Sequence, residues 1–442
     1  MTVASTQRII EHLSSDEEPF FPKEPISIEE TGLGIGFLSE LALKTMYTVG
    51  LTSGAEVADA LGLPFTNVTA PLLEFLRREH LCEVTGTSGL AESSYNYVLT
   101  EKGRARGRES MERSQYVGEA PVPLDDYAGA TLRQSLQGHI ISERVLREGL
   151  ADLVLRGETL SQLGPAINSG RSMFLFGPPG NGKTAISEAI GHLLPGAIYI
   201  PYAIHVEGHV IKVFDLHNHR LLEATANRGV TGNSLRTRVD RRWVRIRRPA
   251  IIVGGELNME NLDLVCDGVT NMYEASFQMK ANNGMLLIDD FGRQQARPRD
   301  LLNRWIMPLE RRVDYLTLHT GKKIEVPFDL LIVFSTNLEP KDLVDEAFLR
   351  RIRYKIPIVN PSFDEYREIF RRVCQLKGIP YDDRALAYLI REHYIKEERP
   401  LRAVHPRDIL DELADIARFR RQRPKLTAEL LDEACRAYFV KM

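Results

Sequence analysis

Apolar residues recur at helical spacing in three consecutive stretches near the start of the chain, residues 38–49, 53–62 and 67–81. Residues 82–100 then hold two short strand-like runs, "CEVTG" and "YNYVLT", around a turn rich in Gly and Ser, which predicts a hairpin. The stretch 101–114 predicts a closing helix. The pattern therefore indicates a small domain of three helices, a hairpin and a fourth helix.

This order of elements is typical of a winged helix-turn-helix domain, and we expect one over residues 37–114. The residues before it, 1–36, are acidic and carry prolines, so they are expected to form a mobile tail. The stretch after it, 115–127 ("QYVGEAPVPLDDY"), is broken by prolines and is expected to be a linker.

Strand-like and helical stretches alternate from residue 128 onward. The runs "SMFLFG", "GMLLIDD" and "LLIVFSTN" are separated by helical patterns, which implies an α/β domain over residues 128–360. Its sheet is expected to be mostly parallel, with helices on both faces, and residues 205–283 are expected to be an insertion of mixed, partly basic sequence. Residues 361–442 are almost all helical in pattern and are expected to form a C-terminal α-helical lid.

Composition narrows the class of protein. The 442 residues carry a formal net charge of -3, so any contact with nucleic acid would need a local basic patch. Four scattered cysteines without CxxC spacing argue against a zinc cluster or a disulfide framework and fit a reducing cytosol. No apolar run is long enough to span a bilayer, and the first residues do not resemble a signal peptide. We expect a cytoplasmic protein without membrane insertion.

The stretch "GPPGNGKT" satisfies the Walker A pattern GxxxxGK[ST] of a P-loop, directly after a strand and before a helix. Its glycines let the backbone turn tightly so that N–H groups and the helix N-terminus converge on phosphate groups. Lys183 is expected to reach the β- and γ-phosphates, and the Thr184 hydroxyl to ligate Mg²⁺. The sequence therefore predicts ATP and Mg²⁺ as ligands. The expected nucleotide-binding residues are Gly177, Pro178, Pro179, Gly180, Asn181, Gly182, Lys183 and Thr184.

Two carboxylates end the strand "MLLIDD", at the edge where open α/β sheets place their ligands. Asp289 is expected to hold Mg²⁺, directly or through water. Asp290 is expected to act as the general base that polarises the attacking water.

The phosphate loop, "LLIDD", "FSTN", "DEAFLRRI" and "HPRDIL" occur in that order, and together they resemble the AAA+ ATPase module from about residue 125 to the C-terminus. The resemblance implies ATP hydrolysis, with Asn337 as the sensor-1 residue. It implies that Arg350, with Arg351 as the second match, is an arginine finger for a neighbouring subunit. It also implies that Arg407 is the sensor-2 arginine of the lid.

Within AAA+, the segment with a hairpin between the acidic strand and sensor 1 looks closest to the MoxR-like branch. Two features depart from the family. Asp290 stands where Glu is usual, so the water must lie closer or hydrolysis is slow. The stretch between the phosphate loop and Asp289 is also longer than usual.

Two groups inside the insertion raise further hypotheses. Seven arginines lie between Arg236 and Arg248, with alternation that puts Val244 and Ile246 on one strand face. They suit contact with a polyanion, pairing at a subunit interface, or an ordinary solvated face. Four histidines of "HVEGHVIKVFDLHNH" could meet on two strands, although such histidines are common without a metal. These histidines are His205, His209, His217 and His219.

These features lead to three hypotheses of function. In the first, the chain is an ATP-hydrolysing AAA+ motor or switch that assembles as a ring, a homo-hexamer, and remodels an unidentified protein client in a chaperone-like way. The main alternative is a DNA-associated, ATP-controlled regulator that uses its winged helix. The third is a scaffold that binds and senses ATP without hydrolysing it. Neither the start of the third helix nor the wing carries a basic residue, so docking to protein or autoregulation is favoured over DNA.

Overall fold

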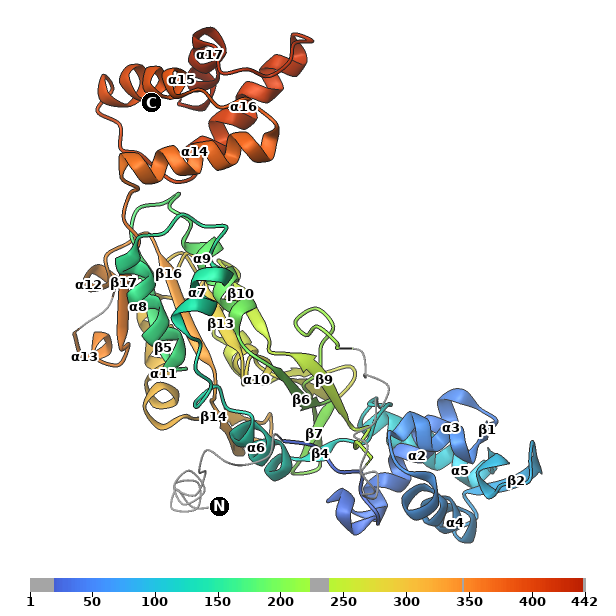
Figure 1. Cartoon of the computed structure of the whole chain (residues 1–442). Helices are drawn as coiled ribbons and strands as arrows, with labels where there is room; N and C mark the ends of the chain where they lie inside the picture. Colours follow the sequence, from blue (N-terminus) through green and yellow to red (C-terminus); the bar gives the residue numbers. More distant parts are fainter. Residues whose placement is uncertain (1–19, 223–237, 344–345, 440–442) are drawn as a thin grey trace.

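A five-stranded parallel sheet lies between an N-terminal domain at one end of the molecule and a group of C-terminal helices at the other (Figure 1). The computed structural model describes residues 20–222, 238–343 and 346–439. The hydrogen-bonded strand order is β10-β13-β16-β5-β17, and each neighbouring pair is parallel. The strands are β5 (Ser172–Phe176), β10 (Ala250–Val253), β13 (Met285–Ile288), β16 (Leu331–Thr336) and β17 (Tyr354–Pro357).

Helices cover both faces of this sheet, because successive strand side chains point to opposite sides. Met173 and Leu175 of β5 belong to the apolar cluster of one face, and Phe174 belongs to that of the other. The first face is covered by α7 (Glu143–Gly149), α8 (Gly157–Asn168) and α9 (Lys183–Leu193). The second is covered by α11 (Pro298–Arg311), and the short helices α12 (Pro340–Leu343) and α13 (Glu346–Leu349) follow β16.

The C-terminal region is helical and has its own apolar core. Its elements are α14 (Phe363–Lys377), α15 (Asp383–Ile390), a π-helical turn (Arg391–Ile395), α16 (His405–Phe419) and α17 (Ala428–Tyr438). The predicted fold class is therefore confirmed as an α/β sheet domain with a P-loop, followed by a helical C-terminal region. Within the described part of the chain, no helix is long and apolar enough to cross a membrane.

The elements of the N-terminal domain follow the predicted order. The helices are α2 (Ile35–Val49), α3 (Gly54–Leu61), α4 (Ala70–Arg78) and α5 (Glu101–Arg113), and the strands are β1 (Thr52–Ser53), β2 (Cys82–Thr87) and β3 (Tyr95–Leu99). Pro71 does not end the third helix: a π-helical stretch (Phe65–Thr69) leads directly into α4, and Pro71 stands in the first turn of α4. The winged helix function of this domain stays a prediction.

Two boundaries predicted from composition are wrong. Part of the expected tail is packed: Phe20 meets the edges of Tyr199 and Trp243, and Leu33 is buried. The expected linker contains β4 (Val122–Pro123), which pairs with the insertion. β4 is an edge strand, where a proline is tolerated, so the prolines that suggested a linker are compatible with a sheet.

The insertion forms a second sheet together with β4, in the order β11-β12-β8-β7-β4, and beside it lies the antiparallel pair of β6 and β9. The hairpin of β14 and β15 and the helix α6 share one apolar cluster with strands of this second sheet. These elements are α6 (Leu124–Arg133), β6 (Ala197–Pro201), β7 (Ala203–Val206), β8 (His209–Lys212), β9 (Trp243–Arg247), β11 (Val265–Asp267), β12 (Met272–Glu274), α10 (Phe277–Lys280), β14 (Val313–Thr317) and β15 (Lys323–Pro327).

The N-terminal domain packs against the insertion. Ala203 of β7 and Val210 of β8 belong to the apolar core of that domain. Arg241 forms an ion pair with Asp59 and donates to the carbonyl of Leu63 at 2.7 Å. The two parts therefore share one core.

Two arginines of the arginine-rich stretch are used inside the molecule. Arg242 is 3% exposed, pairs with Asp240 at 2.8 Å and donates to the carbonyl of Thr31. Arg248 donates to the carbonyls of Pro195, Gln134 and Asn283, and burial lowers its pKa to about 10. Arg236 lies outside the described residues. Arg242 and Arg248 are thus unavailable to a polyanion.

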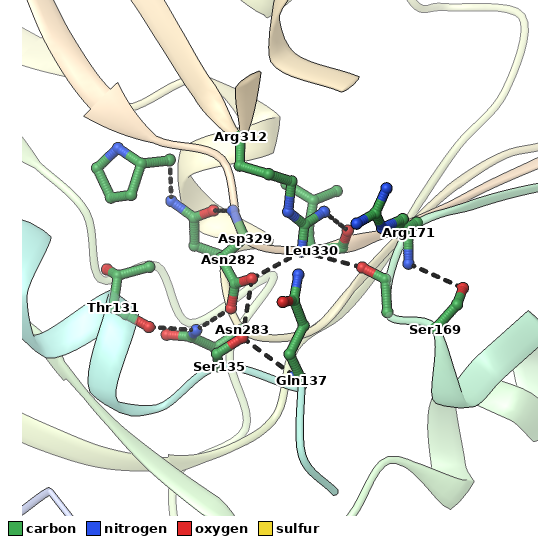
Figure 2. Close-up of polar contacts among 12 residues, drawn as sticks. Thr131, Ser135, Gln137, Ser169, Arg171, Asn282, Asn283, Arg312, Asp329 and Leu330 are labelled. Atoms are coloured by element: carbon green, nitrogen blue, oxygen red, sulfur yellow. Dashed lines mark hydrogen bonds and ion pairs between the residues drawn. The ribbon is translucent and has the colours of Figure 1, made fainter. Parts of the chain in front are cut away.

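A buried polar cluster closes the amino-terminal edge of the parallel sheet (Figure 2). The carboxylate of Asp329, just before β16, accepts hydrogen bonds from Arg312 at 2.7 Å, Ser135 at 3.0 Å and Asn283 at 2.8 Å. Arg312 also donates to the carbonyl of Gly170, just before β5. Asp329 therefore joins the segment after α6 to two strands.

We expect Asp329→Ala to destabilise the protein by about 3–5 kcal/mol, because it leaves the buried Arg312 charge without its carboxylate. Urea denaturation followed by circular dichroism measures this. The control is Glu74→Ala, which breaks the exposed pair with Arg77 and should cost about 0.5 kcal/mol or less. Equal stability of the two variants would contradict the importance of this cluster.

Candidate functional site

The predicted residues of the phosphate loop, the two acids and Asn337 meet at the carboxyl edge of the sheet, where three adjacent strands end. β16 lies between β5 and β13. The phosphate loop follows β5, Asp289 follows β13 and Asn337 follows β16. Residues from three distant parts of the sequence therefore lie side by side.

The phosphate loop depends on glycines with left-handed backbone. Gly177, Gly180 and Gly182 have φ angles of 139°, 81° and 82°, a region that other residues rarely adopt. A side chain on Gly177 would also meet the carbonyl oxygen of Ile358 at 2.3 Å. Since α9 starts at Lys183, the loop and the N-terminus of this helix form a cradle suited to an anion.

Lys183 is held across this cradle. Its Nζ donates to the carbonyls of Gly177 at 2.8 Å and Pro178 at 3.0 Å and to Oδ1 of Asn337 at 2.7 Å. Burial lowers the pKa of Lys183, and the carboxylates of Asp290 and Asp289 partly offset this effect. The ammonium is thus placed between the loop and the two acids.

The two predicted magnesium ligands touch each other. The Thr184 hydroxyl donates to Oδ2 of Asp289 at 2.8 Å. A hydroxyl and a carboxylate beside a phosphate cradle are the oxygen donors that Mg²⁺ uses together with substrate phosphates. The residues present therefore fit this ion.

Asp290 is exposed and its carboxylate is oriented by Asn337, whose Nδ2 donates to Oδ1 at 2.9 Å. The backbone of Asp290 is left-handed, with φ of 48°, which is costly for a residue other than glycine. Gln294 braces this turn by donating to the carbonyl of Asp289 at 2.9 Å. Sequence analysis missed Gln294, which carries no motif.

The C-terminal helical region contacts the phosphate loop directly. The backbone N–H of Val404 donates to the carbonyl of Gly180 at 2.8 Å, and that of Ala403 donates to Oδ1 of Asn181 at 3.2 Å. Asn181 in turn donates to the side chain of Asn360 at 2.8 Å. Sequence analysis missed Ala403, Val404 and Asn360, because no side-chain chemistry marks them.

Arg407, the predicted sensor-2 residue, lies in the first turn of α16. Its side chain is 65% exposed and pairs with the adjacent Asp408 at 3.0 Å. The residues just before α16 lie on the phosphate loop instead. The sensor role of Arg407 stays a prediction.

The predicted arginine fingers lie at the opposite edge of the sheet. Arg350 pairs with Glu346 at 2.9 Å, and Arg351 pairs with Glu310 at 2.5 Å. Together with Arg171 and Arg353, they line an open cavity of about 690 Å³ that also includes Ser172, the first residue of β5. Since the phosphate loop follows the last residue of β5, the strand separates the two sites by about 16 Å.

Two of the four histidines of the insertion are used in packing. His205 lies against the ring of Phe37, and His219 is buried, with ring nitrogens bonded to the N–H of Asp215 and the carbonyl of Lys280. No group of three or more His, Cys, Asp or Glu suited to a metal is found among the residues that the structure describes.

Comparison with known proteins gives a match to a family model and matches to many solved structures. Residues 362–437 match the family model described as Domain of unknown function (DUF8689). Among curated proteins, none matches the sequence.

Two kinds of solved structure are similar at a low level. NtrX from Brucella abortus is 15% identical, with a TM-score of 0.39, over 66% of this chain and 57% of its own. The chain thus spans less than two thirds of the length of NtrX. The Holliday junction branch migration motor RuvB from Thermotoga maritima is 14% identical, with a TM-score of 0.34, over 70% of this chain and 73% of its own. At these scores the likeness has no bearing on the activity of this chain.

The segment that contacts the phosphate loop depends on a buried histidine at the start of α16. His405 is 5% exposed and its Nδ1 lies 3.0 Å from the hydroxyl of Tyr394. Burial lowers its pKa to about 4, and the charges of Arg402 and Arg399 contribute.

This depressed pKa predicts acid sensitivity. The neutral histidine stabilises the fold fully above its unfolded pKa of about 6.5, and the contribution of about 3 kcal/mol is lost as the pH falls toward 4. Urea denaturation at pH 7 and pH 5 should show a loss of stability that His405→Gln removes, while the exposed His217→Gln control retains it. The same loss in His405→Gln would contradict this assignment.

Proposed function

We propose that the chain is an ATPase of the AAA+ type. The observation that supports this proposal is a chain of hydrogen bonds from Lys183 to Asn337 and from Asn337 to Asp290, beside the hydrogen bond between Thr184 and Asp289. These contacts bring a phosphate cradle, a magnesium-binding pair and an oriented carboxylate together in one site. Phosphoryl transfer to water requires these three parts.

Each residue has a defined task in this proposal. The loop N–H groups and Lys183 bind the phosphates. To do so, Lys183 replaces its hydrogen bonds to the loop carbonyls by contacts with phosphate oxygens. Thr184 and Asp289 hold Mg²⁺, which when bound neutralises negative charge on the phosphate oxygens. Asp290 accepts the proton of the attacking water, and Asn337 keeps its carboxylate directed at the site.

The position of the arginine cavity supports a shared active site. Arg350 and Arg351 lie at the amino-terminal end of β5, so they cannot serve the nucleotide bound at its carboxyl end. We infer that they serve the nucleotide of a neighbouring copy in a ring, for which a hexamer is our proposal. ATP turnover would then change how neighbouring copies are arranged, and the ring would remodel a macromolecular client.

The DNA-associated alternative receives less support. The burial of Arg242 and Arg248 removes two cations from the basic stretch that could contact a polyanion. Addition of nucleic acid to an ATPase assay distinguishes the two functions, since several-fold stimulation favours the DNA-associated regulator.

Lys183→Ala should abolish ATP binding, because the loop loses the only cation that contacts it through a side-chain hydrogen bond among the described residues. Asp290→Asn should instead bind ATP normally and lose turnover, because the amide cannot accept the proton of water. Binding of a fluorescent ATP analogue and phosphate release measure the two effects. Full turnover by Asp290→Asn would mean that the base lies elsewhere.

Arg350→Ala should keep its ATP affinity within a few-fold and lose turnover by a factor on the order of 10³. Mixing it with Lys183→Ala should restore activity, because some junctions pair an intact phosphate loop with an intact finger. Glu346→Ala, which removes the carboxylate paired with Arg350, is the matched control and should retain turnover. Full turnover by a verified monomer of the parent protein would refute the shared site.

A further inference from the structure

The segment of residues 402–404 is fastened to the phosphate loop by its backbone. Val404 and Ala403 donate to Gly180 and Asn181, as described above. Gly180 leaves room for this contact, because a Cβ on it would lie 2.7 Å from Cγ1 of Val404. The segment therefore has a fixed position over the loop, and its side chains lie close to the phosphate-binding residues.

Arg402 is the charged residue of this segment. Its Cδ atom would lie 3.7 Å from a Cβ on Gly180, so its aliphatic stem passes directly over the loop. The residue is half-buried, and within the described parts of the chain its guanidinium has no hydrogen-bond or ion-pair partner. An arginine is always charged, so a cation without a carboxylate stands at the rim of the phosphate cradle.

We propose that Arg402 binds the phosphate chain of the nucleotide. This inference rests on the proposed ATPase function. Gly180 belongs to the part of the loop whose N–H groups face phosphates, and a guanidinium matches phosphate oxygens with two parallel hydrogen bonds. Arg407 is a weaker candidate for this contact because Asp408 already pairs with it. Arg402 thus connects the helical region to the phosphates and reports their presence to it.

The test compares ligands with and without phosphates on the full chain. Dissociation constants for ATP and adenosine are measured by calorimetry for the parent protein, Arg402→Ala, Arg402→Lys and a control. The control is Arg391→Ala, which removes an exposed arginine of the same helical region that pairs only with the adjacent Glu392 among described residues. Thermal melting of each variant shows whether the helical region is folded.

We expect Arg402→Ala to weaken ATP binding about tenfold or more and to leave adenosine binding within about twofold, since only ATP offers the anionic oxygens. Arg402→Lys should recover part of the loss, because it keeps the charge but not the fork of donors. Arg391→Ala should bind both ligands as the parent does.

Three outcomes would overturn the inference. Unchanged ATP binding in Arg402→Ala would mean that the guanidinium does not reach the phosphates. Equal weakening for ATP and adenosine would mean that Arg402 only holds the helical region in place. If Arg402→Ala fails to fold, a parent-like ratio of the two constants in Arg402→Gln overturns it, and a ratio reduced about tenfold supports it. A parent protein that binds no ATP would instead refute the proposed function itself.

Discussion

The parallel pairing of β5, β16 and β13 is the constraint on which the site depends. β5 and β16 end level with each other, since Phe176 pairs with Thr336, so the phosphate loop and Asn337 start at the same height. β13 ends two positions earlier, where Ile288 pairs with Phe334. Asp290 bridges this difference by its left-handed turn, after which the N–H of Phe291 donates to the carbonyl of Ser335 at 2.7 Å. The strained backbone of Asp290 is therefore the consequence of strand register, and it brings the carboxylate to Asn337.

Much of the site follows from short-range rules. The phosphate loop and the acidic strand end are local motifs, and the rule that parallel strands meet their ligands at the carboxyl edge places Asp289 near Thr184. The alternation that put Val244 and Ile246 on one face of their strand also holds, since both side chains are buried.

The remaining contacts were not predictable for physical reasons. Val404 and Ala403 reach the phosphate loop through backbone N–H groups, which every residue except proline possesses. The carbonyl partners of Arg242 and Arg248 come from distant parts of the sequence and are set by tertiary folding. The sequence alone therefore cannot distinguish these buried arginines from a basic surface patch. Residues 20–36 were expected to be mobile because acidic composition does not show that single apolar side chains, such as Phe20 and Leu33, find packing partners.

The two end domains are attached to the sheet by different kinds of interaction. The N-terminal domain shares an apolar core with the insertion. Arg248, between β9 and β10, connects the insertion to the sheet by donating to the carbonyls of Pro195, before β6, and Asn283, before β13. The helical C-terminal region has a separate apolar core and meets the sheet domain through polar contacts, such as those of Arg156 with Glu365 and of Arg372 with Ala151.

Polar interfaces between domains permit relative motion, whereas a shared apolar core resists it because separation would expose buried side chains to water. The sheet, the insertion and the N-terminal domain should therefore move as one body. The helical region is the part that can shift when the phosphate loop changes its ligands, because it contacts Gly180 and Asn181 directly by hydrogen bonds. Any work done by this protein would then be the motion of the C-terminal helices relative to the rest, with the N-terminal domain fixed as the surface against which that motion acts.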